Sequence, residues 1–175
     1  IFAEISESLD SQKEAADLIS SLVFQTPFLY GEADSPLDIV GEHVQEDLCI
    51  MSHTDRGWIL TAGSVYFPSF WNLLHKLGNP MSFIHELVPK WNKRIGDVIS
   101  ARMNNMSSGI PFERFNWTIT TESQRFQPEG ERTYRLIEAK DVGDNVFMRV
   151  ERQILYKLEN TKDILFTIRT YLYPL

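Results

Sequence analysis

The feature that most constrains the fold is a pair of apolar runs separated by the polar group at residues 53–57. The runs cover residues 48–50 and 58–67, and the second is rich in aromatic and β-branched residues. Gly57 can take the positive φ that a tight hairpin turn needs. The sequence therefore predicts a β-hairpin whose second strand ends before Pro68, because proline has no backbone N–H to donate to a sheet.

A histidine follows this hairpin in a segment bounded by prolines. Ser69 can cap a short helix over residues 70–77, which Gly78 and Pro80 would end. His85 then lies in a short stretch between secondary-structure elements. Such junctions are where a rigid scaffold commonly presents its chemistry.

The length and composition indicate a folded chain. It has 175 residues, of which 43% are hydrophobic, and this predicts a single domain with a real core over residues 1–175. No apolar run approaches the roughly 20 residues of a membrane helix, and no signal peptide is recognisable, so we expect no membrane partner. The sequence starts at Ile1 rather than Met, which leaves open whether further residues precede it.

Charge and cysteine content narrow the classes of function. The net charge of −7 argues against a nucleic-acid partner, which would favour a basic surface. Cys49 is the single cysteine, so the chain has no internal disulfide, and we expect a reducing, cytoplasmic location. An iron–sulfur cluster held by this chain alone is excluded, since such a cluster takes about four Cys or His ligands.

The rest of the chain predicts two longer helices and three more strands. The helices are expected at residues 12–24, with a capping-box pattern from Ser11 to Glu14, and at residues 90–106. The strands are expected at residues 114–122, 145–158 and 164–172, residues 27–42 are expected to form a loop, and residues 133–140 suit either a helix or a strand.

This order of elements indicates an α+β fold. Antiparallel pairs joined by short turns, with helices between them, suggest one curved antiparallel sheet of about five strands with helices packed on one face. A sheet of this kind with a ligand pocket under its helices is the architecture of PAS domains. On the pattern of elements alone, the PAS architecture is one option among several.

His85 has two interpretations. An isolated loop histidine is more often hydrogen-bonded to backbone than functional, while the alternative is an axial ligand to haem iron or another metal. His43, His53 and His75 are weaker candidates. None of the four histidines has the close spacing of a zinc site, so a zinc site built by protein ligands alone is not expected.

The alternation of side chains along a strand indicates which polar residues could share one face of the sheet. Arg114 and Asn116 share one strand face, where they could bind an anionic group, or the arginine could form a structural ion pair. Glu46 and Asp47 point to opposite faces of their strand and so cannot enter one pocket together. Two further strands carry a polar cluster that could serve an anionic cofactor but ranks higher as a solvent-exposed salt-bridge ladder: Arg149, Glu151, Arg152, Gln153 and Arg169.

Seven short segments, taken in order, resemble a known family. They are 44–48 (VQEDL), 67–71 (FPSFW), 76–78 (KLG), 84–89 (IHELVP), 114–117 (RFNW), 151–155 (ERQIL) and 166–171 (FTIRTY). In this order they resemble the haem-dependent oxidative N-demethylase α-subunit-like family. The resemblance covers most of the chain, and although each segment is short, their order is specific.

The resemblance implies a PAS-like fold that binds haem b. In the characterised enzyme of this kind the haem site activates O2 and oxidises dimethylamine, a small secondary amine, with release of formaldehyde equivalents. The electrons come from NADPH through FMN and a 2Fe–2S centre on reductase-type partner subunits, and tetrahydrofolate captures the one-carbon unit. The single cysteine of this chain agrees with that division of labour.

The resemblance also implies roles for individual residues. His85 matches the histidine of the family's Ile-His-x-Pro-Val-Pro motif and would be the iron ligand. The remaining expected site residues are polar groups for the haem propionates or the O2 and substrate side, with two aromatic side chains lining the pocket: Arg114, Asn116, Arg152, Arg169, Trp71 and Trp117. The chain departs from the motif at Leu87, where the family usually has proline.

Three hypotheses follow from the sequence. The first is a haem-dependent oxygenase subunit that acts on a small secondary amine and receives electrons from a partner reductase. The second is a non-catalytic haem or small-ligand sensor on the same fold, and the third is a PAS-like structural domain without haem. Colour separates the third from the others, and perturbation of the haem spectrum by an amine separates the first from the second.

Overall fold

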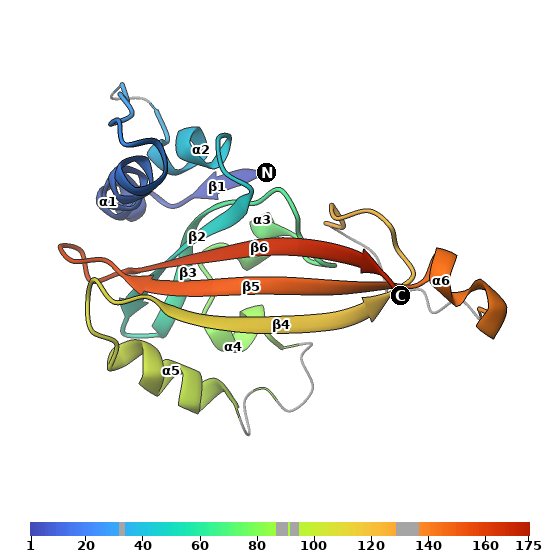
Figure 1. Ribbon diagram of the computed structural model, residues 1–175. Coiled ribbons are helices and arrows are strands. Elements are labelled where there is room, and N and C mark those ends of the chain that lie inside the picture. Colours follow the sequence, from blue (N-terminus) through green and yellow to red (C-terminus); the bar gives the residue numbers. More distant parts are fainter. Residues whose placement is uncertain (32–33, 87–90, 92–94, 129–136) are drawn as a thin grey trace.

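Six antiparallel strands form a single sheet in a computed structural model of residues 1–175, which describes residues 1–31, 34–86, 91, 95–128 and 137–175 (Figure 1). The strands occur in the order β1-β3-β2-β6-β5-β4 across the sheet. Their bounds are Phe2–Glu4 (β1), Glu46–Thr54 (β2), Gly57–Ser64 (β3), Phe112–Thr120 (β4), Phe147–Lys157 (β5) and Ile164–Pro174 (β6). If short β1 is left out and strands β2 to β6 are renumbered 1 to 5 in chain order, their order across the sheet is 2-1-5-4-3. This order is consistent with the expected PAS-like sheet.

The hairpin at the start of the sheet is confirmed. Strands β2 and β3 pair antiparallel across the two-residue connection Asp55–Arg56, and Gly57 has a φ of 84°. A bulge between Ile50 and Met51 shifts the register of the pair. Strand β3 ends at Ser64, three residues before the predicted end at residue 67, because the chain there turns away and binds Asp47 through its backbone.

Helices lie on both sides of the sheet. Helix α1 (Leu9–Ile19) continues into a π-helical turn (Ser20–Phe24) and packs with α2 (Pro36–Gly41) against one face of β2, β3 and β6. The opposite face is covered by α3 (Leu73–Lys76), α4 (Met81–Ile84) and α5 (Gly96–Asn104). The α+β class and the antiparallel sheet are therefore confirmed. The helices cover both faces of the sheet, whereas the prediction placed them on a single face.

Two apolar cores separated by the sheet explain this arrangement. One contains Ala15 and Ala16 of α1 and Leu37 of α2, packed on Leu48 and Ile50 of β2. The other core holds the side chains that alternate with these along the strands, together with residues of the histidine segment: Cys49, Met51, Trp58, Leu73, Met81, Trp91, Met103 and Leu155. Because successive strand residues point to opposite faces, β2 supplies both cores.

Several predicted elements need correction. Helix α2 lies inside the predicted loop 27–42, where Pro36 occupies the first helical turn. The predicted helix 70–77 is reduced to Leu73–Lys76, since Phe70 has a positive φ and Asn72, rather than Ser69, caps the helix through Leu74 N (2.9 Å). Most of the predicted helix 90–106 is present as α5, and its residues 90 and 92–94 lie outside the described part.

The strands predicted at the C-terminal end are confirmed to within a few residues. The segment 133–140, for which either state was predicted, is described from residue 137 onward and contains the start of a 3-10 helix, Ala139–Asp141, followed by α6 (Val142–Asn145). The capping box predicted at Ser11 is absent, because α1 begins earlier, at Leu9, and the Ser11 hydroxyl instead donates to Asp163 Oδ2 at 2.6 Å. A tertiary contact therefore replaced the local one.

Candidate functional site

The sheet presents two faces over strands β4, β5 and β6, and only one carries the candidate site. Cross-strand neighbours share a face, so Arg114 of β4, Gln153 of β5 and Ile168 of β6 lie in one row with Asp47 of β2. We call this side, which also carries buried Leu155, the inner face, and the opposite side the outer face.

His85 follows α4 and is partly buried beside the inner face. Its Nδ1 lies 3.0 Å from the carbonyl oxygen of Met81, one turn earlier. Because a carbonyl oxygen can only accept, Nδ1 carries the proton and Nε2 keeps its lone pair. Burial lowers the pKa of His85, and the nearby charge of Arg114 lowers it further, while the bond to Met81 acts in the opposite direction. The ring is therefore a neutral imidazole whose Nε2 has no hydrogen-bond partner among the described residues.

Trp91 fixes the plane of this imidazole. The two rings are stacked, with centroids 3.8 Å apart and an angle of 10° between their planes. Trp91 is only 6% exposed, and its indole Nε1 has no hydrogen-bond partner in the part of the chain that the structure describes. An unpartnered buried donor costs about 1–3 kcal/mol, so such a group in a native structure requires an explanation, such as a bound ligand.

Arg114 lies on the inner face within electrostatic reach of His85. Its Nε donates to Gln153 Oε1 at 2.6 Å, while its two terminal nitrogens find no partner in residues 1–31, 34–86, 91, 95–128 and 137–175. Burial lowers the pKa of Arg114, and the carboxylate of Glu151 partly offsets that effect. The guanidinium thus keeps donors available for an anionic or carbonyl oxygen.

A hydrogen-bond network continues from Arg114 along the inner face. Gln153 donates to Glu151 Oε2 (3.0 Å), and Arg149 Nε donates to Glu151 Oε1 (3.2 Å). Arg149 is fully buried and also donates to the hydroxyl of Thr170 at 3.2 Å. Each buried charge in this row therefore has a partner of opposite charge or a hydrogen-bond acceptor.

Arg149 and Asp47 together attach the segment after β3 to the sheet. Arg149 donates to the carbonyl oxygens of Phe67 (2.5 Å) and Arg125 (3.0 Å), and Asp47 Oδ1 accepts from the backbone of Tyr66 (2.6 Å) and Phe67 (2.9 Å). Burial raises the pKa of Asp47 to about 6, although the two backbone donors and Arg149 lower it. These contacts position the chain that leads to Trp71 and α3.

The structure divides the seven residues proposed from the sequence between the two faces. His85, Arg114 and Asn116 lie on the inner side, and Trp71 packs against the same apolar core as Trp91. The structure does not bring the other three to this side: Arg152, Arg169 and Trp117 lie on the outer face. Leu87, where the family motif has proline, lies outside the described residues.

The outer-face arginines have partners of their own. Arg152 pairs with Glu113 at 2.5 Å, and Arg169 pairs with Glu46 at 3.1 Å. The side chain of Trp117 is 66% exposed. The solvent-exposed salt-bridge ladder expected for the polar cluster is thus present for these arginines, whereas it is wrong for Arg149, Glu151 and Gln153, which lie on the inner face.

Three residues at the site were not assigned to it from the sequence. Trp91 falls only within the predicted helix 90–106, and Arg149 and Gln153 belong to the predicted exposed ladder. The spacing of positions 149, 151, 153 and 155 was an available signal, because alternate strand residues share a face and Leu155 marks that face as buried. Nothing in the sequence alone indicated that Trp91 would stack on His85.

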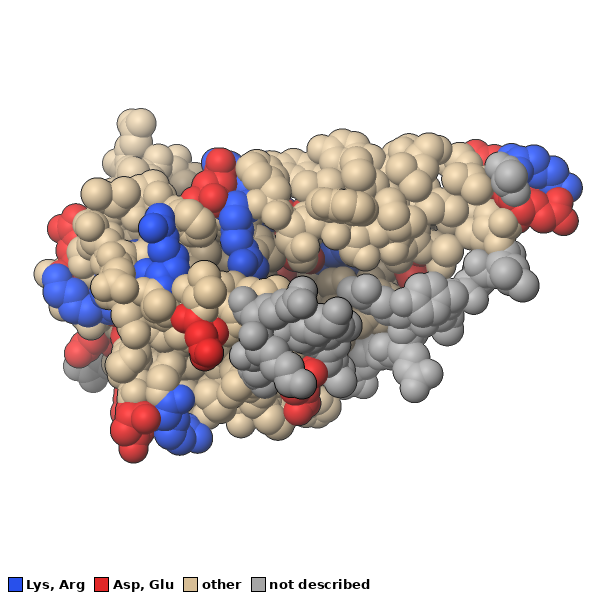
Figure 2. All heavy atoms as spheres, turned by 90° about the horizontal axis from the view of Figure 1, so that it is seen from below, with Lys and Arg blue, Asp and Glu red and all other residues tan. Residues whose placement is uncertain are grey.

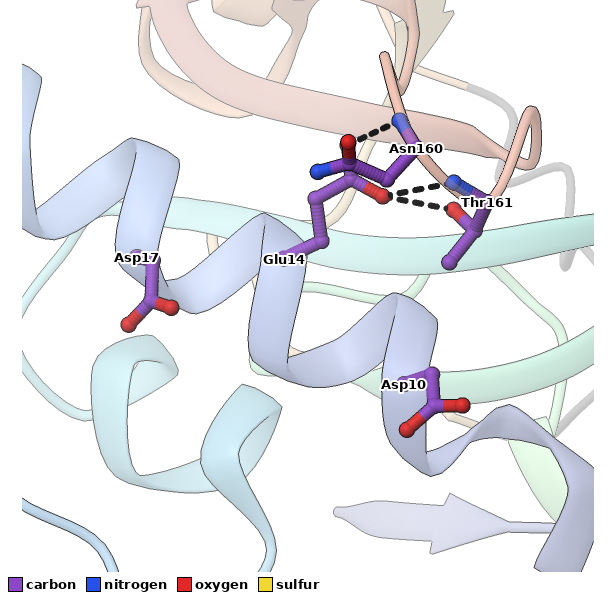
Figure 3. Close-up of a pocket in the computed structure, with 5 residues that line it drawn as sticks. All are labelled: Asp10, Glu14, Asp17, Asn160 and Thr161. Carbon is purple, nitrogen blue, oxygen red and sulfur yellow. Dashed lines mark hydrogen bonds between the residues drawn. The ribbon is translucent and has the colours of Figure 1, made fainter.

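A second feature lies on the other side of the molecule. Asp10, Glu14 and Asp17 of α1 line an open depression with Asn160 and Thr161 of the β5–β6 turn (Figure 3). Glu14 accepts hydrogen bonds from the backbone nitrogens of Asn160 (2.7 Å) and Thr161 (2.9 Å) and from the Thr161 hydroxyl. Its carboxylate therefore caps the turn, and these hydrogen bonds lower its pKa against the effect of burial.

Two further findings concern the chain as a whole. In the described part of the chain no helix is long and apolar enough to span a membrane. The model of the family described as haem-dependent oxidative N-demethylase, alpha subunit-like, matches residues 8–175. Since this match covers nearly the whole sequence, the chain belongs to the haem-dependent oxidative N-demethylase α-subunit-like family.

Proposed function

We propose that this chain binds haem b beside the inner face of the sheet, and that Nε2 of His85 would be its ligand to iron. The observation that carries the proposal is the fixed tautomer of a partly buried imidazole. Nδ1 donates to the Met81 carbonyl, and a hydrogen bond of this type orients a metal-ligating histidine and increases its basicity. The lowered pKa of His85 favours the neutral form that a metal requires.

The neighbouring donors fit an acidic, flat prosthetic group. Haem carries two propionate carboxylates, and the terminal nitrogens of Arg114 are suited to such an anion. The buried indole N–H of Trp91 is a second donor that lacks an acceptor among the described residues. Asn116, on the same face as Arg114, is our candidate for the polar O2 and substrate side.

As the reaction we propose the oxidative N-demethylation of a small secondary amine. Bound haem would supply the O2-activating chemistry, for which the protein has no side chain of its own. The residues of this chain would orient His85, keep it neutral, exclude water through the apolar core around Trp91 and bind anionic groups through Arg114. Arg152, Arg169 and Trp117 have no part in this proposal, because they lie on the outer face.

Electrons would come from reductase-type partner subunits that carry FMN, a 2Fe–2S centre and NADPH, and tetrahydrofolate would take up the one-carbon unit there. Cys49 supports this division, since it is buried in the apolar core and burial raises the pKa of its thiol. A thiol in that environment is not available as a cluster ligand. The family description as an α subunit also supports partner chains.

Haem titration of the purified chain tests the proposal. The wild type is expected to bind haem saturably and give a defined Soret band. His85→Ala should shift or abolish that band and weaken binding at least about tenfold, because an axial bond is lost. His75→Ala is the matched control, since His75 is an exposed histidine on α3 and should leave the spectrum unchanged. Equal haem binding and equal spectra for the wild type and His85→Ala would refute the assignment.

Addition of dimethylammonium to the haem-loaded protein tests the amine substrate. A substrate that binds beside the O2 site should perturb the haem spectrum with a saturable dependence on concentration. Haem binding without any such perturbation would favour the sensor function over the oxygenase. No saturable haem binding by the wild type would overturn both functions.

A further inference from the structure

The outer face of strands β4, β5 and β6 exposes a row of large apolar side chains. Phe115, Trp117 and Ile119 of β4 are 62%, 66% and 47% exposed, and Tyr173 of β6 is 48% exposed. Figure 1 looks onto this face, and α3 and α4 lie behind the sheet. Helices α1 and α2 pack on β2, β3 and β6 and leave β4 uncovered. We call these residues, with Met148, Val150 and Tyr171 between and beside them, the outer apolar face.

Exposed area sets this face apart from ordinary surface. Large side chains of this kind present roughly 150–250 Å² each, so the four exposed ones leave about 400 Å² of apolar surface in contact with water. The largest apolar patch on a soluble monomer typically covers about 300–600 Å² and is often functional, so a patch of about 400 Å² is of the size of an interaction site. The exposed Phe115 and Trp117 on edge strand β4 therefore form part of one continuous apolar patch and are not isolated surface residues.

The profile of the face suits a second copy of itself. The side chains of β4 project most, whereas Met148 and Val150 of β5, directly beside Ile119 and Trp117, are half-buried. The β4 side chains are thus more exposed than their β5 neighbours. A two-fold axis between these strands would place the exposed β4 side chains of each copy over the half-buried β5 side chains of the other, so one surface supplies both halves of the contact.

The charges around the face point to the same partner. The chain carries a net charge of −7, but the charged side chains that the described strands place beside the face include two ion pairs, Arg152 with Glu113 and Arg169 with Glu46. Seen from below, the surface between the charged groups near the middle and those at the α6 end is largely free of Lys, Arg, Asp and Glu (Figure 2). These two ion pairs carry no net charge, so this part of the border does not repel another copy.

We infer that the outer apolar face forms a two-fold homodimer contact with Trp117 near its centre. A standard interface buries about 800 Å² per partner. The four exposed side chains would supply about half of this, and the half-buried Met148, Val150 and Tyr171 with the bordering ion pairs would supply the rest. Since this area is at the lower limit of stable interfaces, the dimer should dissociate on dilution, with a micromolar dissociation constant.

Sedimentation equilibrium over a micromolar to near-millimolar range of concentration tests the inference. The wild type should change from monomer to dimer mass with increasing concentration, independently of haem. Trp117→Glu should weaken association at least about thirtyfold, because it removes a central tryptophan and places like charges opposite each other. Leu29→Glu is the control, since Leu29 is 91% exposed outside this face and should leave the association constant unchanged. Far-UV circular dichroism would verify that both variants are folded.

The other outcomes would overturn the inference. A monomer mass for the wild type over the whole range would exclude the homodimer and leave the face to a different protein partner. A dimer that Trp117→Glu and Leu29→Glu affect equally, or that neither affects, would place the contact on another surface. None of these results depends on whether the chain binds haem.

Discussion

The imidazole of His85 lies parallel to the indole of Trp91, with ring centroids 3.8 Å apart. Together with the bond from Nδ1 to the Met81 carbonyl, this stack leaves the ring little freedom to rotate. Trp91 is itself buried in the core that includes Leu155 of β5 and Met103 of α5. The direction of the histidine is thus set by side chains from the helical layer and the sheet together.

Trp91→Ala is expected to raise the pKa of His85 toward its ordinary value of 6.5. Burial is the main cause of the lowered pKa, and removal of the indole admits water to one face of the ring. NMR titration of the haem-free protein measures this change, with exposed His53 as an internal control. Trp91→Phe, which keeps an aromatic ring, should shift the pKa less. An unchanged His85 titration in Trp91→Ala would show that the stack does not control its environment.

Asp47→Asn is expected to change how stability depends on pH. Burial raises the pKa of Asp47 from 3.8 to about 6, so between these values the folded state binds more protons than the unfolded state. The contribution of Asp47 is therefore fully present below pH 3.8 and is lost as the pH rises through about 6. The free energy of unfolding of Asp47→Asn minus that of the wild type should therefore increase by about 2 kcal/mol between pH 4 and pH 7.

Urea denaturation of both proteins at several pH values measures this difference. The amide side chain of the Asp47→Asn variant keeps an oxygen that can accept from Tyr66 and Phe67, so the backbone contacts are matched. A difference that stays constant with pH would contradict the raised pKa of Asp47.

Arg149→Met is expected to lower the free energy of unfolding by about 3–5 kcal/mol. Removal of one member of a buried ion pair leaves the other charge uncompensated, and here the Phe67 carbonyl would also lose a donor. Arg152→Met, on the outer face of the same strand, is the matched control and should have a much smaller effect. Comparable losses in both variants would mean that burial of Arg149 does not decide its contribution.

Cys49 is expected to be inert in the folded protein. Its side chain is 4% exposed, and burial raises the pKa of its thiol, so little thiolate is present or accessible at pH 8. A colorimetric disulfide reagent should react stoichiometrically in denaturant and at a rate at least about a hundredfold lower in buffer, because reaction then requires opening of the core. Rapid labelling of the native protein would contradict the packing of β2.

Local sequence signals determined most of the secondary structure. Alternation and turn residues located β2, β3, β4, β5 and β6, because strand periodicity and the positive φ of Gly57 are properties of short segments. They missed β1 and α2, which are short elements stabilised by packing on β3 and α1 rather than by their own propensity.

The candidate site shows a similar division. The order of seven short segments was enough to identify the family, and the residue type and position of His85 were enough to single it out. Alternation places Arg149 and Arg152 on opposite faces of β5. The sequence did not show that Arg149 would be buried, because its pairing depends on residues 24 and 82 positions away.

The sequence by itself therefore determined the α+β class, the strands, the family and the histidine. Only the tertiary structure decided that Trp91 stacks on His85, that Arg114 and Arg149 are buried on the inner face, and that Trp117 is exposed on the outer face. The physical reason is that burial and side-chain partners depend on long-range packing across the sheet. Periodicity predicts which residues share a face, but it does not predict which face the helices will cover.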